Sequence, residues 1–250
     1  MPQYVLARHV FVCVQGEHVV FLDVRKDRYF ALESARTAGL GHFVPGWPVP
    51  APFAVDYVRQ TLDSTAPALA ETVDRDVLFG VISLLLEKGI LTAEPDWGRP
   101  AEATVATPLR SDLTADALDE RPSIGPLMFC KFATASLRAR LLLKYRTFEA
   151  VVERVRSRRP QTTAAVTEGE LLTLVGAFAT LQPFFFAAKD ACLFDALSLS
   201  EFLAGYGVFP SWVFGVQSRP FAAHCWLQLE GVVLNDTIDH VKRYTPIMVV

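Results

Sequence analysis

The sequence lacks the features that mark several common classes of protein. Its 250 residues carry a net charge of −3, so no basic excess favours nucleic acid as a partner. There are only four cysteines, their spacing shows no pairing, and no secretory signal precedes them. We therefore expect reduced thiols and a cytoplasmic protein. The four are Cys13, Cys130, Cys192 and Cys225.

Long uninterrupted apolar runs are also missing. The most apolar long stretch, residues 171–188, is interrupted by Gly176, Gln182 and Pro183 and only just reaches the length that spans a bilayer. We expect a buried helix there and no integral membrane segment. Hydrophobic residues nevertheless make up 51% of the chain, which is enough to build a core in one large domain or two small ones.

Composition divides the chain into three parts. Residues 94–126 are rich in Pro, Asp, Glu, Ala and Thr and have no sustained apolar period, which is typical of a flexible linker. Residues 1–93 and 127–250 show strand and helix patterns and are predicted to be two domains. A tether between them would raise the effective concentration at the second domain of a substrate bound to the first.

The first domain is predicted to combine a small sheet with helices. Helices are expected over residues 51–62 and 74–88, the second capped by Asp74 and ended by Gly89. Sheet and helices together indicate a winged-helix-like arrangement. Three β-rich runs separated by polar turns predict an antiparallel meander of residues 4–14, 18–24 and 28–32.

The second domain shows helical patterns first and strand patterns afterwards, an order typical of an α+β fold. Many Lys and Arg residues crowd its first helix, which either solvation or an anionic partner would explain. Helices are predicted over residues 127–155, 168–181 and 193–203, and strands near 208–217, 222–229, 232–236 and 247–250.

Cys192 lies where a helix is predicted to begin. Apolar residues recur at spacings of three and four over 193–203, Asp190 is a good N-cap, and Gly205 or Gly207 would end the helix. Free N–H groups and the positive end of the helix dipole favour a thiolate there. Cys192 is thus a candidate nucleophile whose own N–H could donate to an oxyanion; a purely packed cysteine is the alternative.

His224 and Asp236 are predicted to face each other across a hairpin. A three-residue loop ending at Gly231 would place Asp236 opposite His224, with Cβ atoms about 5 Å apart, whereas a two-residue loop would place it opposite Cys225. We favour the longer loop because it explains Gly231, which readily adopts a left-handed conformation. Thiol, imidazole and carboxylate then form a Cys–His–Asp triad.

Other chemistry at these positions is not predicted. Strand alternation turns Cys225 away from His224, so we expect no part for it in the reaction. A zinc site needs about four ligands at defined spacing. Cys192, His224 and Cys225 do not supply them, so no metal is predicted. Asp239 and His240 form a second acid–imidazole pair, which ranks below the first.

The motifs around these residues resemble a known family. They are Cys192-Leu193 at the start of a helix, Ala223-His224-x-Trp226, and Gly231 followed by Asn235-Asp236. They resemble the transglutaminase-like cysteine protease domain of lasso peptide B proteins, which remove leader peptides from lasso precursors. The resemblance implies a transglutaminase-like, papain-like fold with Cys192 as nucleophile, His224 as general base and acid, and Asp236 as orienting carboxylate.

Four positions depart from the family pattern. Asp195 stands where a basic residue is common, Ala196 where Ser is common, Cys225 where Ala is common, and Gln228 where Glu is common. These departures concern contacts on the substrate side more than the triad.

The first domain carries a second resemblance, in Phe21-Leu22-Asp23 and Tyr29-Phe30-Ala31-Leu32. These runs resemble the precursor-recognition domain shared by many peptide-modifying systems. The resemblance implies that a leader peptide adds as a strand to the sheet edge, at residues 21–24 or 28–32, and packs against the last helix. The implied leader-binding residues are Phe21, Leu22, Val24, Tyr29, Phe30, Val77, Val81 and Leu85.

Together the two resemblances predict a leader peptidase of lasso peptide maturation. They imply a lasso precursor peptide as substrate and an asparagine synthetase-like cyclase as partner. Some relatives are described as ATP-dependent, but the chain has no GxxxxGK[ST] loop, so no cofactor is assigned. Two alternatives stay open: a non-catalytic leader-binding scaffold for the cyclase, and a transglutaminase-type acyltransferase with an amine acceptor in place of water.

Overall fold

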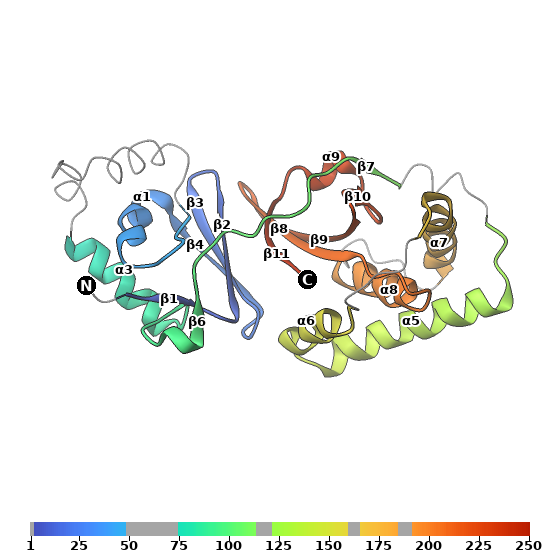
Figure 1. Ribbon diagram of the computed structural model, residues 1–250, viewed down its shortest axis with the longest axis horizontal. Helices are drawn as coiled ribbons and strands as arrows, with labels where there is room; N and C mark the ends of the chain where they lie inside the picture. Colours follow the sequence, from blue (N-terminus) through green and yellow to red (C-terminus); the bar gives the residue numbers. More distant parts are fainter. Residues whose placement is uncertain (1–2, 49–74, 114–121, 160–165, 185–191) are drawn as a thin grey trace. The chain divides into compact units, whose positions relative to one another are not determined.

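The computed structural model describes residues 3–48, 75–113, 122–159, 166–184 and 192–250 (Figure 1). The chain forms two units. The first comprises residues 1–104 and 216–221, and the second comprises residues 105–215 and 222–250. Among the described residues, no helix combines the length and apolar character needed to cross a membrane.

The boundary between the units divides the predicted linker. Residues 94–104 belong to the first unit, and the residues that follow belong to the second. There, β7 (Ser111–Asp112) pairs in parallel with β10 (Val232–Val233), and Leu113 donates its N–H to the carbonyl of Val233. Residues 110–113 of the predicted tether are therefore hydrogen-bonded to a sheet. A two-residue strand has no apolar period, so composition alone does not reveal it.

Two three-stranded sheets lie in the first unit. The antiparallel meander is confirmed, because neighbouring strands pair in sequence order. It consists of β2 (Val10–Gln15), β3 (His18–Asp23) and β4 (Arg28–Glu33). The second sheet has the order β5–β1–β6 and consists of β1 (Val5–Ala7), β5 (Leu91–Thr92) and β6 (Gly98–Arg99). The first predicted run is thus two strands, because the chain turns at Arg8 and His9 and changes sheets.

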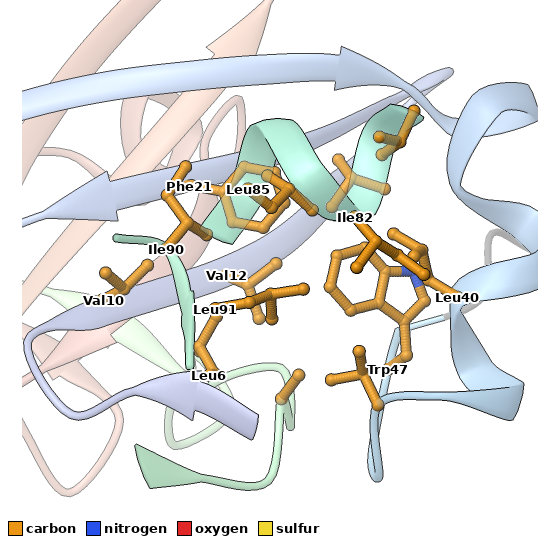
Figure 2. Close-up of a cluster of buried hydrophobic side chains, with 14 of the residues drawn as sticks. Leu6, Val10, Val12, Phe21, Leu40, Trp47, Ile82, Leu85, Ile90 and Leu91 are labelled. Atoms are coloured by element: carbon orange, nitrogen blue, oxygen red, sulfur yellow. The ribbon is translucent and has the colours of Figure 1, made fainter. Parts of the chain in front are cut away.

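The core of the first unit forms between these sheets and one helix, α3 (Arg75–Glu87) (Figure 2). Ile82 and Leu85 of α3 are buried together with Phe21 and Trp47, whose ring centroids are 5.8 Å apart. Burying each such side chain contributes about 1.5–3 kcal/mol. The helix ends at Glu87, one residue short of the predicted end, and Gly89 after it has a φ of 71°.

Most of the predicted leader-binding residues are buried or half-buried in the structure. β3 is the central strand of its sheet, so residues 21–24 do not form the predicted edge, and β4 is an edge. Phe21, Leu22, Val24, Val81 and Leu85 are buried, Tyr29 and Phe30 on β4 are half-buried, and Val77 is 46% exposed.

Some expectations for the first unit stay predictions. The predicted helix over 51–62 and the cap Asp74 lie outside the described residues, and the winged-helix arrangement stays a prediction. The described part also contains α1 (Ser34–Thr37), η1 (Ala38–His42) and η2 (Pro95–Trp97).

The second unit has helices followed by a five-stranded sheet, which confirms the α+β prediction. The sheet order is β11–β8–β9–β10–β7, with β8 (Ser211–Ser218), β9 (Phe221–Leu229) and β11 (Thr245–Val249). The helices are α5 (Pro126–Tyr145), α6 (Phe148–Ser157), α7 (Glu168–Leu181) and α8 (Cys192–Ala204), with η3 (Gln182–Phe184) after α7. α8 packs against α5 (Figure 1).

An aromatic cluster joins three of these helices. Phe132 of α5 lies with its ring centroid 5.3 Å from that of Phe178 on α7 and 6.3 Å from that of Phe202 on α8. All three rings are buried. The cluster fixes α8, and with it the residue at the start of α8, against the helical layer.

The long helix predicted over 127–155 is in fact two helices. α5 ends at Tyr145, and α6 begins after Thr147, whose side chain accepts a hydrogen bond from the N–H of Ala150 at 3.3 Å. Such a cap starts a new helix even though the apolar period continues across it. α7 has the predicted bounds and begins with a capping box between Thr167 and Glu170.

Several of the basic side chains near α5 surround one buried acid. The side chain of Glu201 is 1% exposed. Arg138 Nη1 lies 3.3 Å from Glu201 Oε2, Arg154 Nε lies 3.9 Å from Oε1, and Arg158 also bonds to Oε1. A buried carboxylate without cations would cost several kcal/mol. These three arginines therefore have a structural role in the second unit.

Candidate active site

Cys192 is the first residue of α8 and is partly buried. The helix ends at Ala204, before Gly207, whose φ is 79°. The predicted cap Asp190 lies outside the described residues. N–H groups in the first turn of a helix have no partner within the helix, and they favour negative charge nearby. The start of α8 therefore suits a thiolate.

His224 and Asp236 are brought together by the structure. His224 lies on β9, and its Nε2 atom is 2.5 Å from Oδ2 of Asp236. Each side chain is 15% exposed, so the pair is shielded on most sides and still reachable. Because Nε2 bonds to the carboxylate, Nδ1 is the nitrogen left to face Cys192, with which His224 shares a hydrogen bond.

The hairpin between them differs from the predicted one. Val232 pairs with Leu229, so the loop contains only Glu230 and Gly231, with φ values of 49° and 91°. Two successive positive φ values are those of a type I′ turn. The predicted three-residue loop is therefore wrong: Glu230, and not only Gly231, adopts a left-handed conformation.

Asp236 reaches His224 because the chain bends after β10, and not because the two residues are paired in the strand register. In the observed register Asp236 would lie opposite Cys225, but the ladder ends with β10 and the chain then bends. The side chain of Asn235 accepts the N–H of Leu227 at 2.8 Å, in place of a backbone carbonyl. Asn favours turns because its side-chain oxygen can mimic the backbone in this way.

The same edge of β9 supports Cys192. N–H groups two residues apart on a strand point to the same side, so the N–H of Cys225 points to the edge that Leu227 uses. The Cys192 sulfur accepts hydrogen bonds from this N–H and from the thiol of Cys225. Cys225 was predicted to face away from His224 and to take no part in the reaction, which stays a prediction. Its contacts with the Cys192 sulfur were not predicted.

These contacts determine the charge of Cys192. The hydrogen bond from the Cys225 thiol lowers the pKa of Cys192 most; burial opposes this, and the His224 contact adds to it, giving a pKa of about 4. The pKa of Cys225 rises well above its usual value because its hydrogen bond to Cys192 and its burial retain its proton. At neutral pH Cys192 is therefore a thiolate and Cys225 a thiol that donates to it.

His224 carries the matching positive charge. Burial alone would lower its pKa, but the hydrogen bonds to Asp236 and Cys192 and the charges of both outweigh burial and raise the pKa to about 9. Burial likewise opposes ionisation of Asp236, yet hydrogen bonds from His224 and His240 hold its pKa below the ordinary value. A thiolate beside an imidazolium that a carboxylate orients is an activated cysteine nucleophile.

Asp195 holds the bend in place. It lies one turn along α8 from Cys192, and its Oδ2 accepts a hydrogen bond from Asn235 Nδ2 at 2.7 Å, while its Oδ1 accepts one from Gln182 Nε2 at 2.5 Å. Burial raises the pKa of Asp195 to about 6, against the effect of the Asn235 bond. Sequence reasoning treated Asp195 as a departure on the substrate side. The structure makes it the anchor of Asn235, and its i,i+3 spacing from Cys192 is the signal that it shares a helix face with the thiol.

A second departure from the family pattern is also structural. Gln228 is 2% exposed. Its Oε1 accepts from Trp226 Nε1 at 3.4 Å, and its Nε2 donates to the carbonyl of Thr107 at 2.5 Å. Gln228 therefore fastens residues 105–113 to β9.

His240 belongs to the site, although sequence reasoning ranked it below His224. It lies on α9 (Ile238–Val241), and its Nδ1 is 2.8 Å from the same Asp236 Oδ2 that His224 contacts. The ring centroids of His224 and His240 are 4.8 Å apart. The spacing of four residues between Asp236 and His240 is a signal for this contact, because residues four apart face each other on a helical turn.

Comparison with known families agrees with this geometry. Residues 133–249 match the model of the transglutaminase-like superfamily, so this part of the chain is a transglutaminase-like domain. The matched range contains Cys192, His224 and Asp236. No curated protein and no solved structure matches the chain. The superfamily includes cysteine peptidases and acyltransferases, and both use an activated thiol.

Proposed function

We propose that the protein is a cysteine leader peptidase that acts on lasso precursor peptides. The single observation that carries the proposal is the ion pair of Cys192 with His224, oriented by Asp236 at 2.5 Å. A non-catalytic scaffold has no need of a cysteine whose pKa is about 4. The two resemblances of the sequence, in the order recognition domain and then protease domain, supply the substrate class.

The reaction would proceed through a thioester. The Cys192 thiolate attacks the carbonyl carbon between leader and core, and the N–H of Cys192 donates to the oxyanion that forms. His224 gives its Nδ1 proton to the leaving nitrogen, which becomes the amino terminus of the core. Water then attacks the thioester, His224 accepts its proton, and the leader departs with a new carboxylate while the Cys192 sulfur is restored.

Leader binding would use the β4 edge. β4 is an edge strand of the described sheet, and Tyr29 and Phe30 on it are half-buried. A strand added there would gain backbone hydrogen bonds. Val77 on α3, which is 46% exposed, is a further candidate apolar contact for the peptide. Phe21 and Leu85 would support this surface from the core instead of touching the peptide.

Mass spectrometry of a lasso precursor peptide tests the proposal. The wild-type protein, Cys192→Ala and Cys130→Ala are incubated with the precursor, each with and without the cyclase. Cys130 is an exposed thiol and serves as the matched control. We expect separate leader and core from wild type and Cys130→Ala, and intact precursor that still binds from Cys192→Ala. Intact precursor with every protein in every condition would reject the peptidase.

Adding a primary amine separates the two enzymatic alternatives. A hydrolase yields a free leader carboxylate, whereas an acyltransferase yields a leader whose mass is increased by the amine. If the amide product dominates at modest amine concentration, the peptidase proposal is rejected in favour of the acyltransferase.

A further inference from the structure

The site contains one imidazole more than a Cys–His–Asp triad uses. Oδ2 of Asp236 lies 2.5 Å from His224 Nε2 and 2.8 Å from His240 Nδ1. The triad requires only the first of these contacts. The three ligand-type atoms lie within 4.8 Å of one another. Two imidazole nitrogen atoms thus flank one carboxylate oxygen in the candidate active site.

We propose that His224, Asp236 and His240 form a binding site for a divalent transition metal, with zinc the best-suited ion. Zinc takes imidazole nitrogen and carboxylate oxygen at about 2.0–2.2 Å. In a tetrahedral site with such bonds the ligand atoms lie about 3.3 Å apart. The contacts of 2.5 and 2.8 Å must therefore open slightly, and the wider pair, within 4.8 Å, must close.

The carboxylate is already oriented for such a role. The other oxygen of Asp236, Oδ1, accepts the N–H of Thr237 at 2.7 Å, which leaves Oδ2 to face both imidazoles. The turn that carries His240 is held by the Thr237 side chain and by Asp112, which accepts the N–H of Ile238 at 3.0 Å. Fixing a ligand through its neighbours in this way strengthens metal sites.

Access and donor chemistry favour a reversible site open to solvent. The side chain of His240 is 39% exposed, whereas those of His224 and Asp236 are each 15% exposed, so an ion would enter from the His240 side. Two imidazoles and a carboxylate suit zinc better than calcium or magnesium, which prefer oxygen ligands. Three protein ligands leave the fourth position to water.

Zinc and the triad would compete for the same atoms. An ion bound to Nε2 of His224 and Oδ2 of Asp236 would take the place of the hydrogen bond between them, which orients the imidazole in the triad.

Zinc binding is best measured in a chain that has neither peptidase activity nor a reactive thiol. The double variant Cys130→Ala/Cys192→Ala removes the exposed thiol and the nucleophile, so the result does not depend on the proposed function. Competition with a chromogenic chelator gives the stoichiometry and affinity for ZnCl2. Asp239→Ala is the matched control, because Asp239 is an exposed carboxylate on the same turn and lies outside the three-ligand set.

We expect one zinc ion per chain. His240→Ala in this background should weaken binding at least about tenfold, as expected for loss of a metal-site residue, while Asp239→Ala leaves it unchanged. Thermal melts without metal show whether each variant is folded. The proposal is overturned if the folded double variant binds no stoichiometric zinc, or if His240→Ala binds zinc as well as Asp239→Ala does.

Discussion

Two cysteines of this chain show how strongly surroundings control one functional group. Cys13 lies within β2 and is 1% exposed, and burial raises the pKa of its thiol to about 12. Cys192 begins α8 beside Cys225 and His224, and the pKa of its thiol falls to about 4. Cys192 is itself partly buried, so exposure does not explain the difference. Hydrogen-bond donors directed at the sulfur of Cys192 stabilise the thiolate, and burial alone around Cys13 disfavours it.

The largest expected consequence concerns the triad carboxylate. Asp236→Asn should lower peptidase turnover by about 10⁴-fold, because the amide no longer fixes the tautomer and charge of His224. Single-turnover kinetics on the precursor measure this loss. Cys13→Ala should leave turnover within about twofold of wild type, since its sulfur lies in a different unit. Equal losses of turnover in Asp236→Asn and Cys13→Ala would show that the reaction does not take place at Cys192, His224 and Asp236.

Alkylation by iodoacetamide at pH 6 compares the two thiols directly. From pKa values of about 4 and about 12, the thiolate fractions differ by roughly 10⁶. The lower nucleophilicity of a low-pKa thiolate offsets this by about 10³–10⁴. Cys192 should therefore react about 10²–10³-fold faster than Cys13, as peptide mapping of the modified chain would show. Comparable labelling of both residues would contradict the assigned thiolate.

The pH dependence of turnover should be bell-shaped. Below about pH 4 Cys192 gains a proton and loses its nucleophilicity, and above about pH 9 His224 loses the proton that the leaving amine needs. Activity should thus be highest between these limits and fall on both sides, as kcat/KM measured across pH would reveal. A rise in activity continuing beyond pH 9 would show that the nucleophile is a thiol of ordinary pKa.

Cys225 offers a sharper test of the origin of the low pKa. Cys225→Ala removes the donor that lowers the pKa of Cys192 most. One hydrogen bond to a charged group contributes about 1.5–3 kcal/mol, so the pKa should rise by about one to two pH units. Cys225→Ser keeps a donor and should restore most of the shift. Ultraviolet absorbance of the thiolate against pH measures both, and an unchanged midpoint in Cys225→Ala would assign the effect to His224.

The smallest effects should be on stability. Cys13→Ser places a hydroxyl in an apolar core and should lower the free energy of unfolding by about 1–3 kcal/mol at neutral and at acidic pH. Cys192→Ser removes a thiol whose pKa falls to about 4 on folding, so it should lower the free energy of unfolding at neutral pH and lose this effect as the pH falls through about 4. Urea unfolding of both variants at neutral pH and below pH 4 makes the comparison. A loss for Cys192→Ser that is the same at both pH values would contradict the thiolate.

The sequence predicted which residues form the candidate active site better than it predicted the backbone geometry that brings them together. Helix periodicity places Cys192 at the start of α8, which follows from a local rule. The contact of His224 with Asp236 was also predicted, but from a hairpin register that the structure does not have. The predicted register was wrong because Glu230 as well as Gly231 adopts a positive φ, which makes the loop two residues long. Asp236 then reaches His224 through the bend at Asn235, whose side chain replaces a backbone carbonyl. Strand and helix periodicity in the sequence gives no sign that a side chain, here that of Asn235, will accept a hydrogen bond in place of a strand carbonyl. The contact of Cys225 with Cys192 likewise depends on where β10 ends. The end of a two-residue strand cannot be predicted from the sequence pattern.

The short strand β7 has a practical consequence for the limits of the second unit. The predicted domain start at residue 127 and the family match at 133–249 both exclude Ser111 and Asp112. A fragment cut at either point would leave β10 as an unprotected edge, ready to pair with another molecule. It would also remove the carboxylate of Asp112 that holds the turn bearing His240. A fragment that retains both features must begin before Ser111, and the second unit as a whole begins at residue 105. Fragments that begin after Asp112 are expected to aggregate.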